Sequence, residues 1–162
     1  MESGSNSVLN KVKKGATAKD LVKAGQMTKE AGIEISGFII LGLGGRALWE
    51  EHALETAKVL NQINPDYIRI RTIIVKDGST LKKRMKDGEY QLQSEEEYVL
   101  EHRLLIENLE NIDSYYSNER SMNLMLGVEG RLPEDKAKML SLLDGFLSVS
   151  KEDKLNIKLW YQ

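Results

Sequence analysis

Two apolar segments separated by a helical one constrain the fold of this chain most. Residues 33–42, IEISGFIILG, form a nearly unbroken apolar run, as expected of a strand that is covered on both faces. Residues 47–63 follow with apolar side chains at helical spacing, and residues 67–74 return to a strand-like composition after Pro65. The apolar side of the helical segment comprises Ala53, Ala57, Leu60 and Ile63. Strand, helix and strand in this order predict parallel neighbours joined by a crossover helix, and therefore an α/β fold.

The remaining segments continue this alternation of helix and strand. The predicted helices cover residues 6–13, 18–31, 80–86, 95–110 and 133–147, and a further strand is predicted at 112–116. Thr17 with Asp20 and Ser94 with Glu97 have the spacing of capping boxes at helix starts. The last helix is expected to begin at Pro133. Its buried side is expected to comprise Met139, Leu142, Leu143 and Phe146.

The composition excludes several classes of function. The 162 residues carry a formal net charge of −2, so we expect neither a general attraction to nucleic acid nor one to an anionic membrane. No apolar run approaches the roughly 20 residues of a membrane span, which makes the cytoplasm the expected compartment. The absence of cysteine excludes disulfides and an iron–sulfur cluster held by this chain's own thiolates. We predict no metal site, and solvated or capping roles for His52 and His102.

The strand at 67–74 has two different faces. Ile68, Ile70 and Ile74, with Thr72, should point one way, whereas Tyr67, Arg69, Arg71 and Ile73 should point the other. Burying two unpaired guanidinium groups would cost several kcal/mol each. The arginine face must therefore hold an anionic molecule or water, or it is a face exposed to solvent.

A glycine-rich turn follows the first apolar strand. Residues 37–47, GFIILGLGGRA, place three glycines just before a helix, where the backbone could approach an anion or simply make a tight turn. Gly42, Gly44 and Ala47 also fit the dinucleotide-binding fingerprint. That fingerprint requires an acid at the end of the next strand, about 20 residues on, and Gln62 occupies that distance. We therefore disfavour nicotinamide binding.

Three motifs resemble the radical S-adenosylmethionine superfamily. Residues 2–17, ESGSNSVLNKVKKGAT, resemble the E-S-G end of the fourth barrel strand and the helix after it. Residues 30–45, EAGIEISGFIILGLGG, resemble the fifth strand, and residues 63–81 resemble the sixth strand and its turn. The resemblance covers residues 2–110 and is greatest to the coproporphyrinogen oxidase, elongator and methylthiotransferase-like branch. It implies a partial (β/α) TIM-type barrel, with residues 1–118 as its carboxyl half and 119–162 as a helical extension packed on it.

The resemblance also implies a site for S-adenosylmethionine at the carboxyl ends of the strands. Carried over by position, Glu2 in its E-S-G motif with Ser3 would contact the amino group or ribose. Residues 37–42 would run beside the adenine, and Arg69 or Arg71 would meet the carboxylate or line the substrate cavity. The cofactor-binding positions within residues 37–42 would be Gly37, Ile39, Ile40 and Gly42.

The chain departs from the superfamily in one decisive respect. The C-x-x-x-C-x-x-C loop that binds the [4Fe–4S] cluster is absent from this sequence, and VKDGST at 75–80 lacks the usual prolines. We expect a fragment of a radical S-adenosylmethionine enzyme that is catalytically inert alone and whose cluster belongs to the full-length parent. The alternative is a non-catalytic α/β domain that binds an anion or a partner through Arg69 and Arg71. The open barrel edge also predicts self-association.

Overall fold

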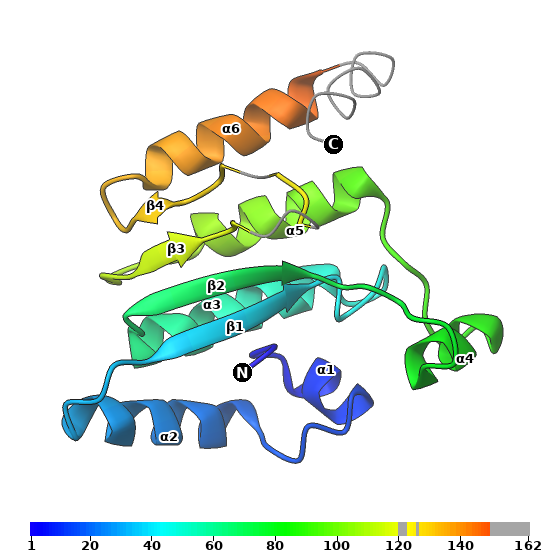
Figure 1. Cartoon of the computed structure of the whole chain (residues 1–162), viewed down its shortest axis with the longest axis horizontal. Helices are drawn as coiled ribbons and strands as arrows, with labels where there is room; N and C mark the ends of the chain where they lie inside the picture. The colour runs from blue at the N-terminus through cyan, green and yellow to red at the C-terminus, as the bar shows by residue number, and fades with distance from the viewer. Residues whose placement is uncertain (120–122, 126, 150–162) are drawn as a thin grey trace.

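The computed structural model describes residues 1–119, 123–125 and 127–149, and shows a four-stranded sheet with helices along one side (Figure 1). The strands lie in chain order, β1 (Ser36–Leu41), β2 (Tyr67–Thr72), β3 (Tyr115–Ser117) and β4 (Gly130–Arg131). β1, β2 and β3 are parallel, and β4 pairs antiparallel with β3. The two longest strands therefore end at the same edge of the sheet.

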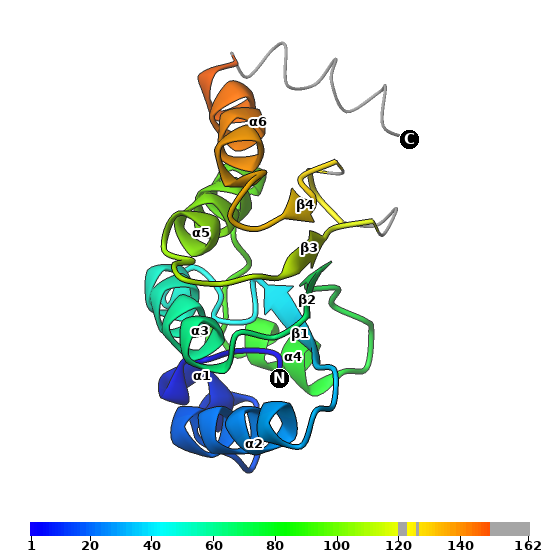
Figure 2. The ribbon, with the colours of Figure 1, turned by 90° about the vertical axis from the view of Figure 1, so that its left-hand side faces the viewer.

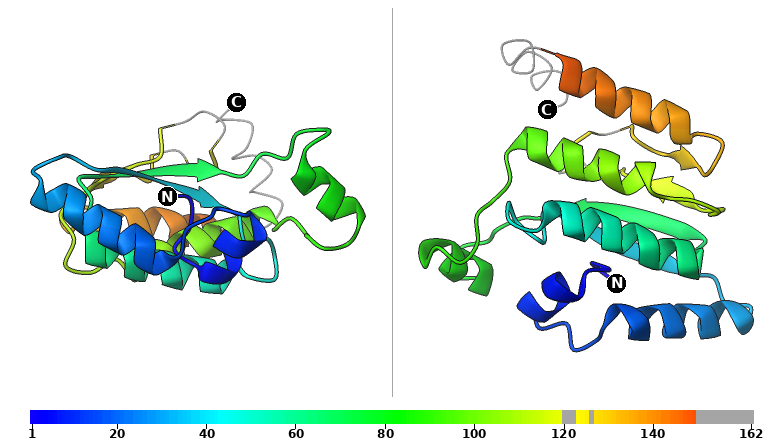
Figure 3. Two further views of the ribbon diagram at one scale, coloured as in Figure 1. Left: turned by 90° about the horizontal axis from the view of Figure 1, so that it is seen from below. Right: turned by 180° about the vertical axis from the view of Figure 1, so that it is seen from behind.

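The long helices all cover the same face of this sheet (Figures 2 and 3). They are α2 (Ala18–Glu30), α3 (Trp49–Ile63), α5 (Glu95–Glu107) and α6 (Lys136–Ser148). Two short helices, α1 (Asn6–Lys11) and α4 (Thr80–Lys86), lie toward the carboxyl ends of β1 and β2 (Figure 1). None of the helices among the described residues is both long and apolar enough to span a bilayer.

Alternate residues of β1 and β2 build the core between sheet and helices. Ile39 pairs in register with Ile70, and both are fully buried with Ile68. Ala57 and Leu60 of α3 pack against them in one apolar cluster. Apolar burial of about 25 cal/mol per Å² makes this cluster the main favourable contribution to the fold.

The predicted elements are found with small shifts at their ends. Both predicted capping boxes are confirmed, because Thr17 and Ser94 each accept a bond from the backbone three residues on and their acid partners bond back. The strand at 67–74 ends at Thr72, so Ile74 is exposed rather than buried with Ile70. Ile73 is partly buried against the core instead.

The start of α6 differs from the prediction. Pro133 belongs to a turn in which Asp135 bonds to both backbone groups of Arg131, and the helix begins at Lys136. Met139 and Leu143 are fully buried, whereas Leu142 is 43% exposed. The two-residue strand β4 was not predicted, because two residues are too short to show a periodic pattern.

The fold class is a mixed α/β structure with a mostly parallel sheet, as expected of a partial α/β barrel. The described residues form an open sheet and do not close into a barrel. Within residues 119–162, β4 extends the sheet and α6 packs on α5. Residues 150–162, which include the weakly alternating tail KLNIKLWYQ, lie outside the described part.

Candidate functional site

The face of the sheet opposite the described helices carries both arginines of β2. Arg69 and Tyr67 are exposed, and Phe38 of β1, which pairs in register with Arg69, is exposed as well. The guanidinium carbons of Arg69 and Arg71 lie 5.9 and 4.9 Å from the centre of the Phe38 ring. The predicted separation of the two faces of β2 is confirmed over Tyr67 to Arg71. We call Phe38, Tyr67, Arg69 and Arg71 the open face.

The guanidinium groups of the open face are oriented by neighbouring groups. Arg71 is half-buried, and its Nη1 donates to the carbonyl of Ile70 at 2.7 Å. Arg69 also stacks against Tyr67 at 5.9 Å and makes no ion pair with an acid in the described ranges. Cations next to aromatic rings suit a planar molecule that carries a negative group, because the ring stacks while the arginine pairs with the charge.

The residues predicted to lie along the adenine fall on two sides of β1. Ile40 is half-buried on the same face as Phe38. Ile39 is fully buried in the core beneath the helices, and a side chain at Gly37 would point toward Leu60 of α3. Strand alternation turns the side chain of Ile39 away from the arginines, whereas Ile40 shares their face.

Glu2 lies beside the outer edge of β1. Its carbonyl accepts a hydrogen bond from the backbone of Ile40 at 3.1 Å, the position that a neighbouring strand would occupy. Its carboxylate pairs with Lys14 at 2.6 Å, and both side chains are about one-third exposed. Glu2 is therefore tied to the edge strand through its backbone, and its carboxylate is engaged by Lys14.

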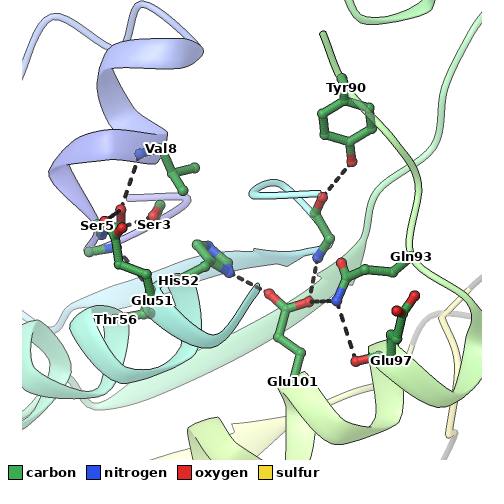
Figure 4. Close-up of polar contacts among 12 residues, drawn as sticks. Ser3, Ser5, Val8, Glu51, His52, Thr56, Tyr90, Gln93, Glu97 and Glu101 are labelled. Carbon is green, nitrogen blue, oxygen red and sulfur yellow. Dashed lines mark hydrogen bonds and ion pairs between the residues drawn. The ribbon is translucent and has the colours of Figure 1, made fainter. Parts of the chain in front are cut away.

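Ser3 belongs to a buried turn against α3 (Figure 4). Its Oγ accepts a bond from the backbone of Ser5, and the next residue, Gly4, donates its backbone N–H to Thr56 of α3. Ser5 caps α1 and donates to Glu51 of α3 at 2.6 Å. The hydrogen bond from Ser5 keeps the pKa of Glu51 below its usual range. Ser3 is engaged within the protein by its bond to Ser5.

A buried polar cluster supports the glycine turn after β1 (Figure 4). Glu101 of α5 is fully buried, and its two oxygens contact His52 at 2.5 Å and the backbone N–H of Gly42 at 2.9 Å. Gln93 donates to the same carboxylate at 2.9 Å. Tyr90 donates to the Gly42 carbonyl, and burial raises the pKa of Tyr90 to about 12. Both backbone polar groups of Gly42 are thus engaged within the protein.

Gly42 is also required sterically. Its φ of +86° lies in the left-handed region, and an added Cβ would come within 2.3 Å of the Tyr98 ring. The turn therefore has a demonstrable packing reason for this glycine.

The two histidines contradict the solvated or capping roles predicted for them. His52 and His102 are each only 1% exposed. Burial lowers the pKa of His102 to about 3, and its ring stacks on Tyr116 at 5.7 Å. Helical spacing held the signal that sequence reasoning missed, since His52 lies one turn before the buried Thr56, and Glu101 lies between the buried Tyr98 and Leu105.

The site thus belongs to a mostly parallel α/β sheet with helices on one face and cations on the other. Comparison with solved structures identifies the archaeal Elp3 of Methanocaldococcus infernus, carrying an N-terminal deletion (1–46), with a TM-score of 0.63. The alignment has 21% identity and covers 89% of this chain and 34% of that one, a likeness of fold.

Sequence comparison points in the same direction. An uncharacterized protein of Methanocaldococcus jannaschii is 31% identical over 107 residues, which are 66% of this chain and 32% of that protein. The tRNA uridine(34) acetyltransferases of M. jannaschii and M. infernus are 30% and 27% identical over 95 residues, 58% of this chain and 18% of each enzyme. The chain thus spans only a minor part of each relative. No protein-family model matches the chain. Together these comparisons show a likeness of fold to Elp3 and a likeness of sequence to two tRNA uridine(34) acetyltransferases.

Proposed function

We propose that this chain is part of a radical S-adenosylmethionine enzyme related to Elp3 and forms part of the wall that faces the cofactor and the substrate. The observation that carries the proposal is the position of Arg69 and Arg71 on the side of a mostly parallel sheet opposite the described helices, next to Phe38. The fold likeness to Elp3 and the three sequence motifs support the same lineage. The names of the relatives make tRNA uridine the substrate to test for the whole protein.

The residues present fit S-adenosylmethionine in part. Arg69 or Arg71 would pair with its carboxylate, Phe38 and Ile40 offer apolar surface to its adenine, and Glu2 offers a carboxylate to its amino group or ribose. When bound with a reduced cluster, the cofactor supplies radical chemistry. This chain's role would be to bind and orient it.

The residues do not fit the [4Fe–4S] cluster. A cluster of this type is held by cysteine thiolates, and the 162 residues contain no cysteine. We therefore assign no reaction step to this chain alone and expect it to be inactive by itself. Cluster ligation would belong to other parts of the full-length parent.

Calorimetric titration with S-adenosylmethionine tests the proposal. We expect weak binding to the 162-residue chain, and Arg69→Ala and Arg71→Ala should weaken it about tenfold each, the loss of a charge-assisted hydrogen bond at a partly exposed site. Lys58→Ala is the matched control, because it removes one positive charge from the exposed side of α3. Equal affinity for wild type and both arginine variants would reject the proposed site.

The alternative is a non-catalytic domain that binds an anion or a partner protein through the same arginines. The exposure of Tyr67 and Phe38 beside them favours this alternative as a specific observation, since flat aromatic surfaces also suit protein interfaces. This alternative would be supported if an anion or a partner protein binds through Arg69 and S-adenosylmethionine does not bind. Tight binding of NADH would contradict both.

We also propose that the chain associates with itself through the sheet edge. β1 is an outer strand of the sheet, and along its free side Ile40 donates a backbone hydrogen bond to Glu2. Unpaired strand edges promote pairing with another chain. Sedimentation velocity should show a concentration-dependent dimer, and a monomer throughout the concentration series would contradict this.

A further inference from the structure

A second polar site lies at the carboxyl end of β1, outside the open face. A cavity of about 260 Å³ lies between the end of α1, the turn after β1 and the segment from α4 to Gln91. These three segments follow one another around the same end of the sheet (Figure 1). The charged residues that line the cavity are Lys11, Arg46, Arg84 and Glu89, so cations outnumber acids three to one in its lining.

The two arginines of this cavity are held in place by the protein. Arg84 donates from Nη1 to the carbonyl of Lys11 at 3.1 Å, which ties α4 to the end of α1. Arg46 donates from Nε to Glu97 at 2.6 Å, and its backbone N–H donates to Gln91. Both contacts restrict side chains that would otherwise lose freedom on binding a ligand, which lowers the entropic cost of recognition.

The acid in the cavity is weakly engaged. Glu89 is 62% exposed and lies 3.4 Å from Nε of Arg84, an exposed ion pair of the kind that contributes little. Lys11 makes no ion pair in the described ranges, although its charge acts on the nearby Glu51. A ligand with two negative charges could therefore replace Glu89 as the partner of Arg84, add Lys11 and share Arg46 with Glu97.

The surroundings increase the positive potential. The helix α4, TLKKRMK, carries four cations and no acid. The overall charge of −2 thus conceals a local excess of positive charge at this end of the sheet. Such an excess attracts anions and raises their local concentration.

We propose that this cavity binds a phosphate ester. Planar guanidinium groups match phosphate oxygens with paired hydrogen bonds, and a lysine adds a point charge. The volume lies just below the roughly 300 Å³ at which pockets for drug-sized ligands begin, which suits a phosphate with its adjoining sugar rather than a whole cofactor. The site is separate from the open face, because none of the four residues of the open face lines the cavity.

Calorimetric titration of the 162-residue chain with AMP and with adenosine tests this assignment. AMP should bind and adenosine should not, because the phosphate supplies the recognition. Lys11→Ala and Arg46→Ala should each weaken AMP binding about threefold to tenfold, and the double variant more than either. Lys58→Ala, with the same loss of charge on α3, should leave AMP binding unchanged.

Three outcomes would overturn the proposal: adenosine binding as well as AMP, the double variant binding AMP like wild type, or Lys58→Ala weakening AMP binding as much as Lys11→Ala. Inorganic phosphate and a ten-residue oligouridine identify the source of the phosphate, since a nucleic-acid backbone predicts tighter binding of the oligonucleotide with a steeper salt dependence. S-adenosylmethionine titrated into Lys11→Ala should behave as with wild type. If S-adenosylmethionine fails to bind at all, the function proposed above fails and the phosphate site does not.

Discussion

The two faces of β2 show how one short strand serves two purposes. Ile68 and Ile70 are fully buried beneath the helices, whereas Tyr67 and Arg69, their immediate neighbours in sequence, are exposed on the other side. The covered face contributes the burial that stabilises the fold, and the open face contributes little to stability. Guanidinium groups are costly to bury, which is why Arg69 and Arg71 lie on the open face and not under the helices.

The largest expected effect comes from breaking the buried polar cluster beneath the helices. Glu101→Ala would leave the N–H of Gly42, the ring of His52 and the amide of Gln93 without their shared partner. Removing one member of a buried charged network costs about 3–5 kcal/mol. Urea denaturation should show this loss in the free energy of unfolding.

Glu107→Ala is the control for that experiment. Glu107 lies on the same helix, is 47% exposed and pairs with Arg103. Its loss should cost no more than about 0.5 kcal/mol. Equal destabilisation by both variants would mean that the cluster around Glu101 is not a structural unit.

A matched pair on adjacent residues of β2 tests the difference between the two faces directly. Ile70→Ala should destabilise the chain by about 2–5 kcal/mol, because it leaves a cavity among fully buried side chains. Arg69→Ala should change the free energy of unfolding by less than about 0.5 kcal/mol. Similar losses for both would show that the arginine face is also part of the packed interior.

The smallest effect concerns acid stability. The pKa of His102 is about 3 in the folded chain against about 6.5 unfolded, so the unfolded chain binds the extra proton between these values. Stability is therefore complete above pH 6.5 and falls as the pH decreases toward 3, by at most about 1.4 kcal/mol per pH unit. Denaturation midpoints should decrease from pH 6.5 to 5.

His102→Leu should flatten that decrease, because the variant has no imidazole to protonate. Between pH 6.5 and 5, the loss of stability caused by His102 is separated from the loss caused by protonation of carboxylates, which occurs at lower pH. Asp66, for example, has its pKa lowered by the backbone of Ile35 and by Lys29, and its contribution is lost only below about pH 4. An unchanged slope in the variant would assign the acid sensitivity to other groups.

The sequence predicted the elements well and the polar contacts poorly, for physical reasons. Period-two alternation in β2 and helical spacing in α3 are local properties, so the faces of Ile70 and Leu60 followed from the residues alone. Glu101 and Gly42 are 59 residues apart, and their hydrogen bond depends on how α5 packs against the turn. The charged residues of α5 indicated a solvated surface. Only the tertiary packing shows that Glu101 and His102 are buried.

The same reason separates the candidate site residues. Arg69 and Phe38 come together because parallel strands in register place them side by side, which the sequence supports once both strands are recognised. Whether Ile39 or Ile40 shares the face of the arginines depends on the register between β1 and β2, which the sequence alone does not give. The cavity for which we propose phosphate binding draws on residues 11, 46 and 84, which no single motif connects.

The crossing of Gly4 over α3 has a consequence for the far side of the sheet edge. An added Cβ at this position would lie 2.5 Å from the carbonyl of Glu55, so any larger residue must lift the leading segment away from the helix. Glu2 is two residues upstream, and its bond to Ile40 requires that the segment before α1 stays packed against α3. The missing side chain of Gly4 thus determines whether Glu2 can lie at the sheet edge where the cofactor is proposed to bind.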